Sequence, residues 1–144
     1  MQVVTDTFDR SYQATPASVG RVRAEVAAFA AANGVAPARV DDIRLAVSEA
    51  VTNAVIHGYR ERSGTVHVTA EHADGALSIS IRDFGCGMRP RLLRSGGTGM
   101  GVGLVLIGRL VSELALAPQG GEGTDVRMRF DLAAARAGRH AAVA

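Results

Sequence analysis

The sequence predicts an α+β fold in which helices cover one face of an antiparallel or mixed sheet. Strand-like and helical segments follow one another in the order β-α-α-β-β-α-β-β, with no internal repeat or linker. The chain of 144 residues is long enough for one domain with a buried core. We therefore expect a two-layer α/β sandwich over residues 1–132, followed by a disordered Ala/Arg/Gly-rich tail at 133–144.

The first half of the chain is predicted from apolar spacing and from helix end signals. Residues 2–9 are strand-like. Thr15-Pro16 predicts a helix start, with threonine as the N-cap and proline in the first turn, and Asn33-Gly34 predicts its end. A second helix is predicted from Pro37 to about Gly58, with Val40, Ile43, Val47, Ala50, Val51 and Ala54 as its core stripe.

The second half alternates strands with a glycine-rich stretch and an apolar helix. Two strands with alternating apolar residues flank Asp74-Gly75, which is typical of a hairpin turn. The glycine-rich stretch spans residues 85–103 and an apolar helix follows it. The last two strands are predicted at 114–117 and 124–131.

The composition favours a globular protein without membrane spans or disulfides. It is 47% hydrophobic and 21% charged, and no apolar run approaches the roughly 18 residues that cross a bilayer. The first ten residues hold no apolar signal segment. Cys86 is the single cysteine, so an internal disulfide is impossible and a cytoplasmic location is expected.

The absence of lysine from the sequence excludes two common ways of binding ATP. A P-loop needs a lysine on the nucleotide phosphates, and a eukaryotic-type protein kinase needs a lysine on a strand. The formal charge is only +2, and no arginine cluster alternates with aromatic residues. Direct binding of nucleic acid therefore has no support.

A row of polar residues lies along the edge of the second helix's core stripe. Glu49, Asn53 and His57 follow at intervals of four residues, beside the small residues Ala46 and Ala50. A carboxylate can activate a hydroxyl or a water, and an amide oxygen suits Mg²⁺. Spacing alone fits a solvated helix flank equally well.

Two glycine loops are candidates for binding a ligand. Asp83 follows a strand and precedes Gly85 and Gly87, which could direct a carboxylate into a pocket or form a simple turn. A second run, from Gly96 to Leu104, opens directly into a helix, where free N–H groups favour phosphate. Its glycines alternate and no strand precedes them, which argues against a dinucleotide fingerprint and leaves a flexible hinge as the alternative.

Together these motifs resemble the GHKL (Bergerat-fold) ATPase superfamily. The matching motifs, in order, are Glu49-x-x-x-Asn53, Asp83-x-Gly85-x-Gly87, Gly99-x-Gly101-x-Gly103-Leu104 and Gly123-Thr124. The segment from Ser48 to Tyr59 is similar to the anti-sigma factor serine kinases of sporulation and general-stress partner-switching systems. The resemblance covers roughly residues 8–131.

The resemblance implies ATP and Mg²⁺ as ligands and assigns roles by position. Glu49 would be the general base and Asn53 the Mg²⁺ ligand, while Asp83 and Thr124 would contact the adenine. The remaining implied nucleotide-binding residues are Gly85, Gly87 and Met88 in the adenine pocket, and Gly97, Thr98, Gly99, Met100, Gly101, Val102, Gly103 and Leu104 at the phosphates.

The function implied is a serine kinase that sequesters a sigma factor and phosphorylates a STAS-domain anti-anti-sigma partner. The family also implies a homodimer, and Arg21 and Arg23 are candidates for partner contact or simply solvated surface. Two alternatives stay open: a stress-signalling switch kinase that binds no sigma factor, and a non-catalytic nucleotide-gated binding module. The short segment of Arg89 to Thr98, in the position of the family's lid, favours the last, whereas Glu49 argues against it.

Overall fold

The computed structural model describes residues 6–58, 64–84, 99–118 and 123–132. Its elements follow the predicted order, with one added π-helical turn. They are β1 (Asp6–Gln13), α1 (Pro16–Ala32), α2 (Pro37–Asn53), η1 (Ala54–Gly58), β2 (Thr65–Ala73), β3 (Ala76–Asp83), α4 (Gly99–Leu110), β4 (Glu113–Pro118) and β5 (Thr124–Asp131).

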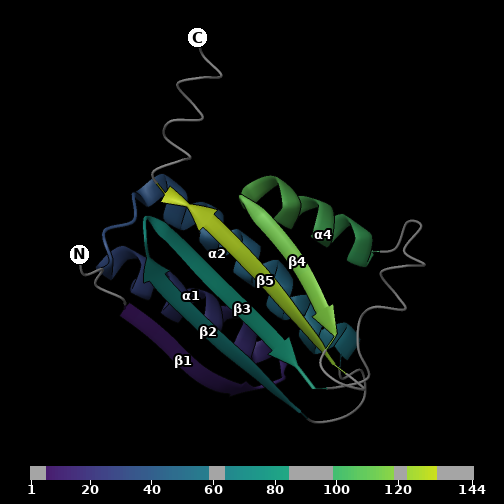
Figure 1. Ribbon diagram of the computed structural model, residues 1–144. Helices are drawn as coiled ribbons and strands as arrows, with labels where there is room; N and C mark the ends of the chain where they lie inside the picture. The colour runs from purple at the N-terminus through teal and green to yellow at the C-terminus, as the bar shows by residue number, and fades with distance from the viewer. Residues whose placement is uncertain (1–5, 59–63, 85–98, 119–122, 133–144) are drawn as a thin grey trace.

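The five strands form one antiparallel sheet in the order β1-β2-β3-β5-β4. The helices lie on one face of this sheet, as Figure 1 shows. The predicted α+β sandwich is therefore confirmed, and of the two sheet types expected the antiparallel one is found. Because β5 inserts between β3 and β4, the ends of β3 and β5 lie side by side although they are distant in sequence.

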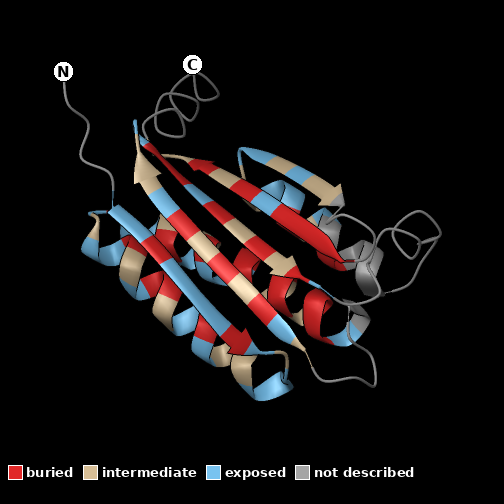
Figure 2. Cartoon of the chain, turned by 60° about the horizontal axis from the view of Figure 1, so that its bottom comes forward, coloured by how far each residue is buried: buried red, intermediate tan, exposed pale blue. Residues whose placement is uncertain are grey.

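The core lies between the sheet and the helices. Along β2, β3 and β5 every second side chain is buried, which gives the alternating red stripes of Figure 2. Period-2 burial is expected where one face of a sheet packs on helices and the other does not. The predicted core stripe of α2 is confirmed, since all six of its residues are buried.

Most of the predicted end signals are confirmed. Pro16 and Pro37 open α1 and α2, and α1 ends at Asn33 and Gly34, where the glycine has a positive φ of 82°. The Thr15 hydroxyl lies 3.2 Å from Ser18 Oγ and makes no side-chain capping bond to the backbone. Asp74 and Gly75 have φ values of 56° and 74°, as a tight hairpin turn requires.

Two predicted boundaries were wrong. The first strand was expected at residues 2–9, whereas β1 continues to Gln13 and pairs with β2 throughout. The polar residues after Phe8 suggested that the strand ends there. In the structure the strand continues, and the Arg10 guanidinium lies 5.4 Å from the centre of the Phe8 ring. The third helix begins at Gly99, within the glycine run. The second helix reaches Gly58 as predicted, but it changes from α to π after Asn53.

No helix among the described residues is both long and apolar enough to cross a membrane.

Candidate functional site

Buried polar side chains single out the site. Among the described residues four polar or charged side chains are buried: Asn53, Asp83, Thr124 and Asp125. Burying such groups costs free energy unless they are satisfied or serve a ligand. The first three of the four are residues that the sequence predicts to bind nucleotide.

Glu49 and Asn53 come together against the beginning of α4. A methyl group placed on Gly103 would lie 2.9 Å from Glu49 Oε1, 3.5 Å from Asn53 Nδ2 and 3.7 Å from Asn53 Oδ1. The two side chains share one face of α2 because they are four residues apart. The glycine is thus what lets the carboxylate and the amide approach the glycine-rich helix so closely.

Asn53 has an unsatisfied donor. Its residue is 5% exposed, and Nδ2 is buried with no hydrogen-bond acceptor among the described residues. An unmet buried donor costs about 1–3 kcal/mol. A phosphate oxygen would satisfy it, and the amide oxygen of the same side chain is a suitable ligand for Mg²⁺.

The described residues contain no group of three His, Cys, Asp or Glu that could hold a metal ion by themselves. Magnesium at phosphate-transfer sites is usually held by one or two protein oxygens together with substrate phosphates and water. One amide oxygen and one nearby carboxylate therefore fit an ion that arrives with its nucleotide.

A π-helical turn follows Asn53 directly. Ala54–Gly58 forms η1, and its residues Ala54 and Val55 are buried, while Ile56 is exposed. Short π-helical turns occur often at functional sites, because they redirect the side chains beside them. His57 lies within η1, but its side chain is outside the described part of the chain.

The second part of the site is at the end of the central strand pair. Asp83 and Thr124 are register partners at the ends of β3 and β5, and both are fully buried. Their side chains point to the helix-covered face, because the alternate residues Ile81 and Val126 are also buried there. A carboxylate and a hydroxyl in adjoining positions can together form hydrogen bonds with the polar edge of a ring such as adenine.

Gly123 makes this arrangement possible. In the sequence it was noted only as part of the Gly123-Thr124 motif, and no role was predicted for it. Its φ is 97°, and a methyl group built on it would lie 2.3 Å from the Asp83 carbonyl oxygen. Only glycine fits this backbone contact. The signal was present in the sequence as the glycine directly before Thr124.

The structure describes only part of the predicted site. Glu49, Asn53, Asp83, Gly103 and Thr124 are placed as above. Gly99, Met100, Gly101, Val102 and Leu104 lie in α4, but their side chains are outside the described part. The remaining predicted residues, which are Gly85, Gly87, Met88, Gly97 and Thr98, lie outside the described residues, as does the segment 89–98.

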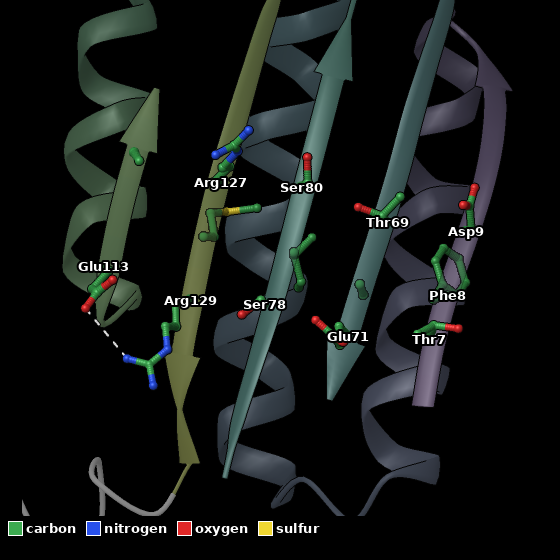
Figure 3. Close-up of a pocket in the computed structure, with 14 residues that line it drawn as sticks. Thr7, Phe8, Asp9, Thr69, Glu71, Ser78, Ser80, Glu113, Arg127 and Arg129 are labelled. Carbon is green, nitrogen blue, oxygen red and sulfur yellow. Dashed lines mark ion pairs between the residues drawn. The ribbon is translucent and has the colours of Figure 1, made fainter. Parts of the chain in front are cut away.

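The face of the sheet away from the helices carries a separate feature. A hollow of about 630 Å³ lies on it, lined by residues of all five strands. Figure 3 shows the lining residues, among them Thr69, Ser78 and Arg127. Beside it Asp125 is fully buried, accepting hydrogen bonds from the Ser80 hydroxyl at 2.5 Å and from Arg82 and Arg127 at 3.2 and 2.9 Å.

This hollow is separate from the predicted nucleotide site. Asp125 and Arg82 are the register pair next to Thr124 and Asp83, so their side chains point to opposite faces of the same two strands. The Asp125 cluster explains the fourth buried polar residue without a ligand.

A further polar cluster joins β1 to α1. The Tyr12 hydroxyl donates to Glu25 Oε1 at 2.6 Å, and Arg10 and Arg21 lie on the same carboxylate at 3.3 Å. Burial and the neighbouring Glu25 raise the pKa of Tyr12, while the hydrogen bond from Tyr12 lowers the pKa of Glu25. The cluster ties the edge strand to its helix.

The candidate partner residues on α1 both make contacts within the chain. Arg21 lies 5.9 Å from the centre of the Tyr12 ring, and its side chain is 70% exposed. Arg23 donates to Ser48 Oγ at 3.3 Å and is exposed. Each keeps enough exposed surface to meet a partner.

Comparison with known proteins gives a consistent result. Residues 12–130 match the family described as the histidine kinase-like ATPase domain. The anti-sigma F factor of Clostridium acetobutylicum is 33% identical over 120 residues, which cover 74% of this chain and 80% of that protein. The anti-sigma F factor of Shouchella clausii is 33% identical over 129 residues, covering 80% and 85%.

Solved structures of related proteins are also similar to this chain. The crystal structure of the RsbU and RsbW domains of Rv1364c from Mycobacterium tuberculosis superposes with a TM-score of 0.70 at 30% identity. The superposition covers 88% of this chain and 32% of that one. The SiaB-SiaC complex from Pseudomonas aeruginosa shows the same fold at 18% identity, with a TM-score of 0.60. The resemblance to GHKL ATPases and anti-sigma factors is confirmed.

Proposed function

This chain belongs to the histidine kinase-like ATPase domain family, and we propose that it is an ATP-dependent serine kinase that also sequesters a sigma factor. The single observation that carries the proposal is the contact of Glu49 and Asn53 with Gly103 of α4. It brings a candidate base and a candidate metal ligand to the helix whose glycine-rich start would bind phosphate. The curated relatives named anti-sigma F factor support the sigma-factor part.

In the proposed reaction, the serine hydroxyl of a STAS-domain anti-anti-sigma partner attacks the γ-phosphorus of ATP. The Glu49 carboxylate accepts the hydroxyl proton while the new O–P bond forms, the bond to the β,γ-bridging oxygen breaks, and ADP leaves. Backbone N–H groups at the start of α4 stabilise the charge on the transferring group. Magnesium, held by the Asn53 amide oxygen, would neutralise phosphate charge.

The nucleotide base would be bound at the other end of the site. Asp83 accepts from the amino group of adenine, and Thr124 bonds the ring nearby. Both side chains are fully buried, so little conformational entropy is lost when they bind the base. This arrangement favours adenine over guanine, because guanine presents a carbonyl oxygen where adenine presents a donor.

The direct test is incubation of the purified protein with Mg²⁺, γ-labelled ATP and STAS-domain proteins encoded nearby in its genome. Label on a partner serine is the expected result. Glu49→Gln should abolish labelling and leave ATP binding intact, whereas Asp41→Asn, an exposed carboxylate on the same helix, should change neither. Normal labelling by the Glu49 variant would remove that residue from the catalytic role.

Two other outcomes select the alternative functions. Labelling of a STAS protein without co-purification of any sigma factor would indicate a stress-signalling switch kinase. Tight ATP binding with no labelled partner, even after a broad screen, would indicate a nucleotide-gated binding module.

We also propose that the protein forms a homodimer through the open face of the sheet. None of the described elements covers this face, which is formed by all five strands. Sedimentation should show a dimer. Ser78→Arg, at an exposed position in the hollow, should give monomers, and Ala24→Arg on the exposed side of α1 should not.

A further inference from the structure

Arg39 lies where α2, α4 and β5 meet. Its Nη1 donates to the carbonyl oxygen of Leu110 at 2.8 Å and to Asp42 Oδ2 at 3.0 Å. The centre of the guanidinium is 5.2 Å from the centroid of the Phe130 ring, which is fully buried. The Arg39 side chain itself is 17% exposed, whereas that of Asp42 is 39% exposed, so the ion pair is partly solvated and the other two contacts are more sheltered from water.

The position of Arg39 is explained by α4 rather than by its own helix. Leu110 is the last residue of α4, and the carbonyl groups of a final helical turn lack partners within the helix. A cation there satisfies a carbonyl and stabilises the helix dipole. In the first turn of α2 the same charge is unfavourable, and Asp42 compensates for it.

The two helices run antiparallel and touch at both ends. The start of α2 meets the end of α4 through Arg39 and Leu110, whereas the end of α2 meets the start of α4 at Gly103. Gly103 and Leu110 are about 10 Å apart along α4, at 1.5 Å per residue. A shift at the Leu110 end of this short rigid helix is therefore felt at Gly103.

Gly103 approaches Glu49 and Asn53 too closely for a side chain to fit between them. The position of its missing methyl group is only 2.9 Å from Glu49 Oε1, so a small rotation or slide of α4 changes how the glycine segment meets the carboxylate and the amide. Glu49 is only partly buried, so its carboxylate can move aside, and a displaced α4 would then change the position of the carboxylate at the site.

We propose that Arg39 is a positioning residue for the nucleotide site. It touches no substrate. It anchors the end of α4 on α2 and β5, so that the start of α4 stays in register with Glu49 and Asn53. Loss of the anchor leaves the fold intact but lets α4 sample positions in which nucleotide binds poorly.

The inference rests on the proposed function for its ATP readout, so the test also includes a readout that needs no nucleotide. Arg39→Met keeps the aliphatic stem against Phe130 and removes both the donor and the charge. Arg39→Lys keeps a cation and a donor. Arg44→Met is the matched control, because Arg44 is exposed on the same helix, and Val40→Ala is a control for simple loss of stability at a neighbouring buried position.

For each variant the melting temperature, the ATP dissociation constant and the hydrogen exchange of backbone amides at residues 99–110 are measured where all variants are folded. Arg39→Met should weaken ATP binding about tenfold and speed exchange in α4, as expected when one charge-assisted hydrogen bond is lost. Arg39→Lys should retain most of the wild-type ATP affinity and most of the protection from exchange in α4, and Arg44→Met should match the wild type in both. Val40→Ala should lower the melting temperature while leaving ATP affinity nearly unchanged.

The proposal is overturned if Arg39→Met and Val40→Ala lower the melting temperature and the ATP affinity in the same proportion. A purely structural role would then suffice. Wild-type protein that bound no ATP would instead remove the proposed function, and in that case the exchange of α4 decides about Arg39 by itself: unchanged exchange in Arg39→Met would refute the anchor.

Discussion

Replacing Gly103 by alanine should stabilise the protein and impair its catalysis at the same time. Glycine inside a helix costs about 0.5–1 kcal/mol relative to alanine. For a chain of this size the gain corresponds to a melting temperature higher by about 2–4 °C. The added methyl group, however, would lie 2.9 Å from Glu49 Oε1.

The size of the catalytic loss follows from that distance. Ordinary contact begins at 3.4 Å, so the carboxylate must retreat by about 0.5 Å or turn away. Misplacing a catalytic group by about 1 Å can cost on the order of 100-fold in rate, so a loss of about tenfold is expected here. Because the end of a glutamate side chain moves freely, the strain on the fold stays small.

The assay compares Gly103→Ala with Gly108→Ala. Gly108 lies on the same helix, and a methyl group there would meet nothing within 4 Å. Both variants should melt at higher temperature in a calorimetric scan, and only Gly103→Ala should lose phosphotransfer to the partner serine. Wild-type turnover in Gly103→Ala would refute the idea that this contact sets the position of Glu49, and equal loss in Gly108→Ala would point to α4 mobility instead.

Three further predictions concern other parts of the fold. Gly123→Ala should lower the free energy of unfolding in urea by about 1–3 kcal/mol and weaken ATP binding, because its methyl group would clash with the Asp83 carbonyl at a φ of 97°. Asn53→Leu should raise that free energy by about 1 kcal/mol by removing an unmet buried donor, and should abolish the Mg²⁺ dependence of ATP binding in a titration. Tyr12→Phe should lose stability by an amount that depends on pH. Because the pKa of Glu25 is lowered in the folded state, the stability that its ionised form contributes is complete above pH 4.5, the ordinary pKa. This contribution is lost as pH falls through the folded-state pKa. Because the pKa of Tyr12 is raised, the stability that its protonated hydroxyl contributes is complete below pH 10.0 and is lost at higher pH. The difference in unfolding free energy between the wild type and Tyr12→Phe should therefore be largest near neutral pH and shrink at both extremes.

Local signals predicted the fold well where one residue type decides the geometry. Pro16, Pro37 and Asp74-Gly75 fix helix starts and a hairpin turn through their own backbone preferences, and these were placed correctly. Regular alternation likewise predicted β3 and β5, because burial on one face imposes it.

Features that depend on distant contacts were missed. The continuation of β1 to Gln13 relies on pairing with β2 and on Arg10 covering an aromatic ring, neither of which shows in the local sequence. The change to a π turn after Asn53 was likewise not predicted. The steric demand on Gly123 exists only because β5 returns beside the end of β3.

The candidate site was predicted mainly from its resemblance to family motifs and only partly from the spacing and chemistry of its residues. Spacing on α2 left Glu49 and Asn53 equally compatible with a solvated flank. The burial of Asn53 at 5% exposure and the contact of both side chains with Gly103 now support the functional interpretation. The role of Arg39 could not be seen in sequence, because Leu110 and Phe130 approach it only in the folded chain.

The pairing of Asp83 with Thr124 has a consequence for how the molecule assembles. After Asp83 the chain makes α4 and the edge strand β4 before β5 begins at Thr124, the register partner of Asp83. The β2–β3 ladder joins neighbours in sequence at a hairpin, whereas the β3–β5 ladder has to close over α4 and β4, and the β1–β2 ladder over α1 and α2, so both of these should form later in folding. A ligand that contacts both Asp83 and Thr124 would stabilise this closure, because it would join two strand ends that α4 and β4 separate in sequence.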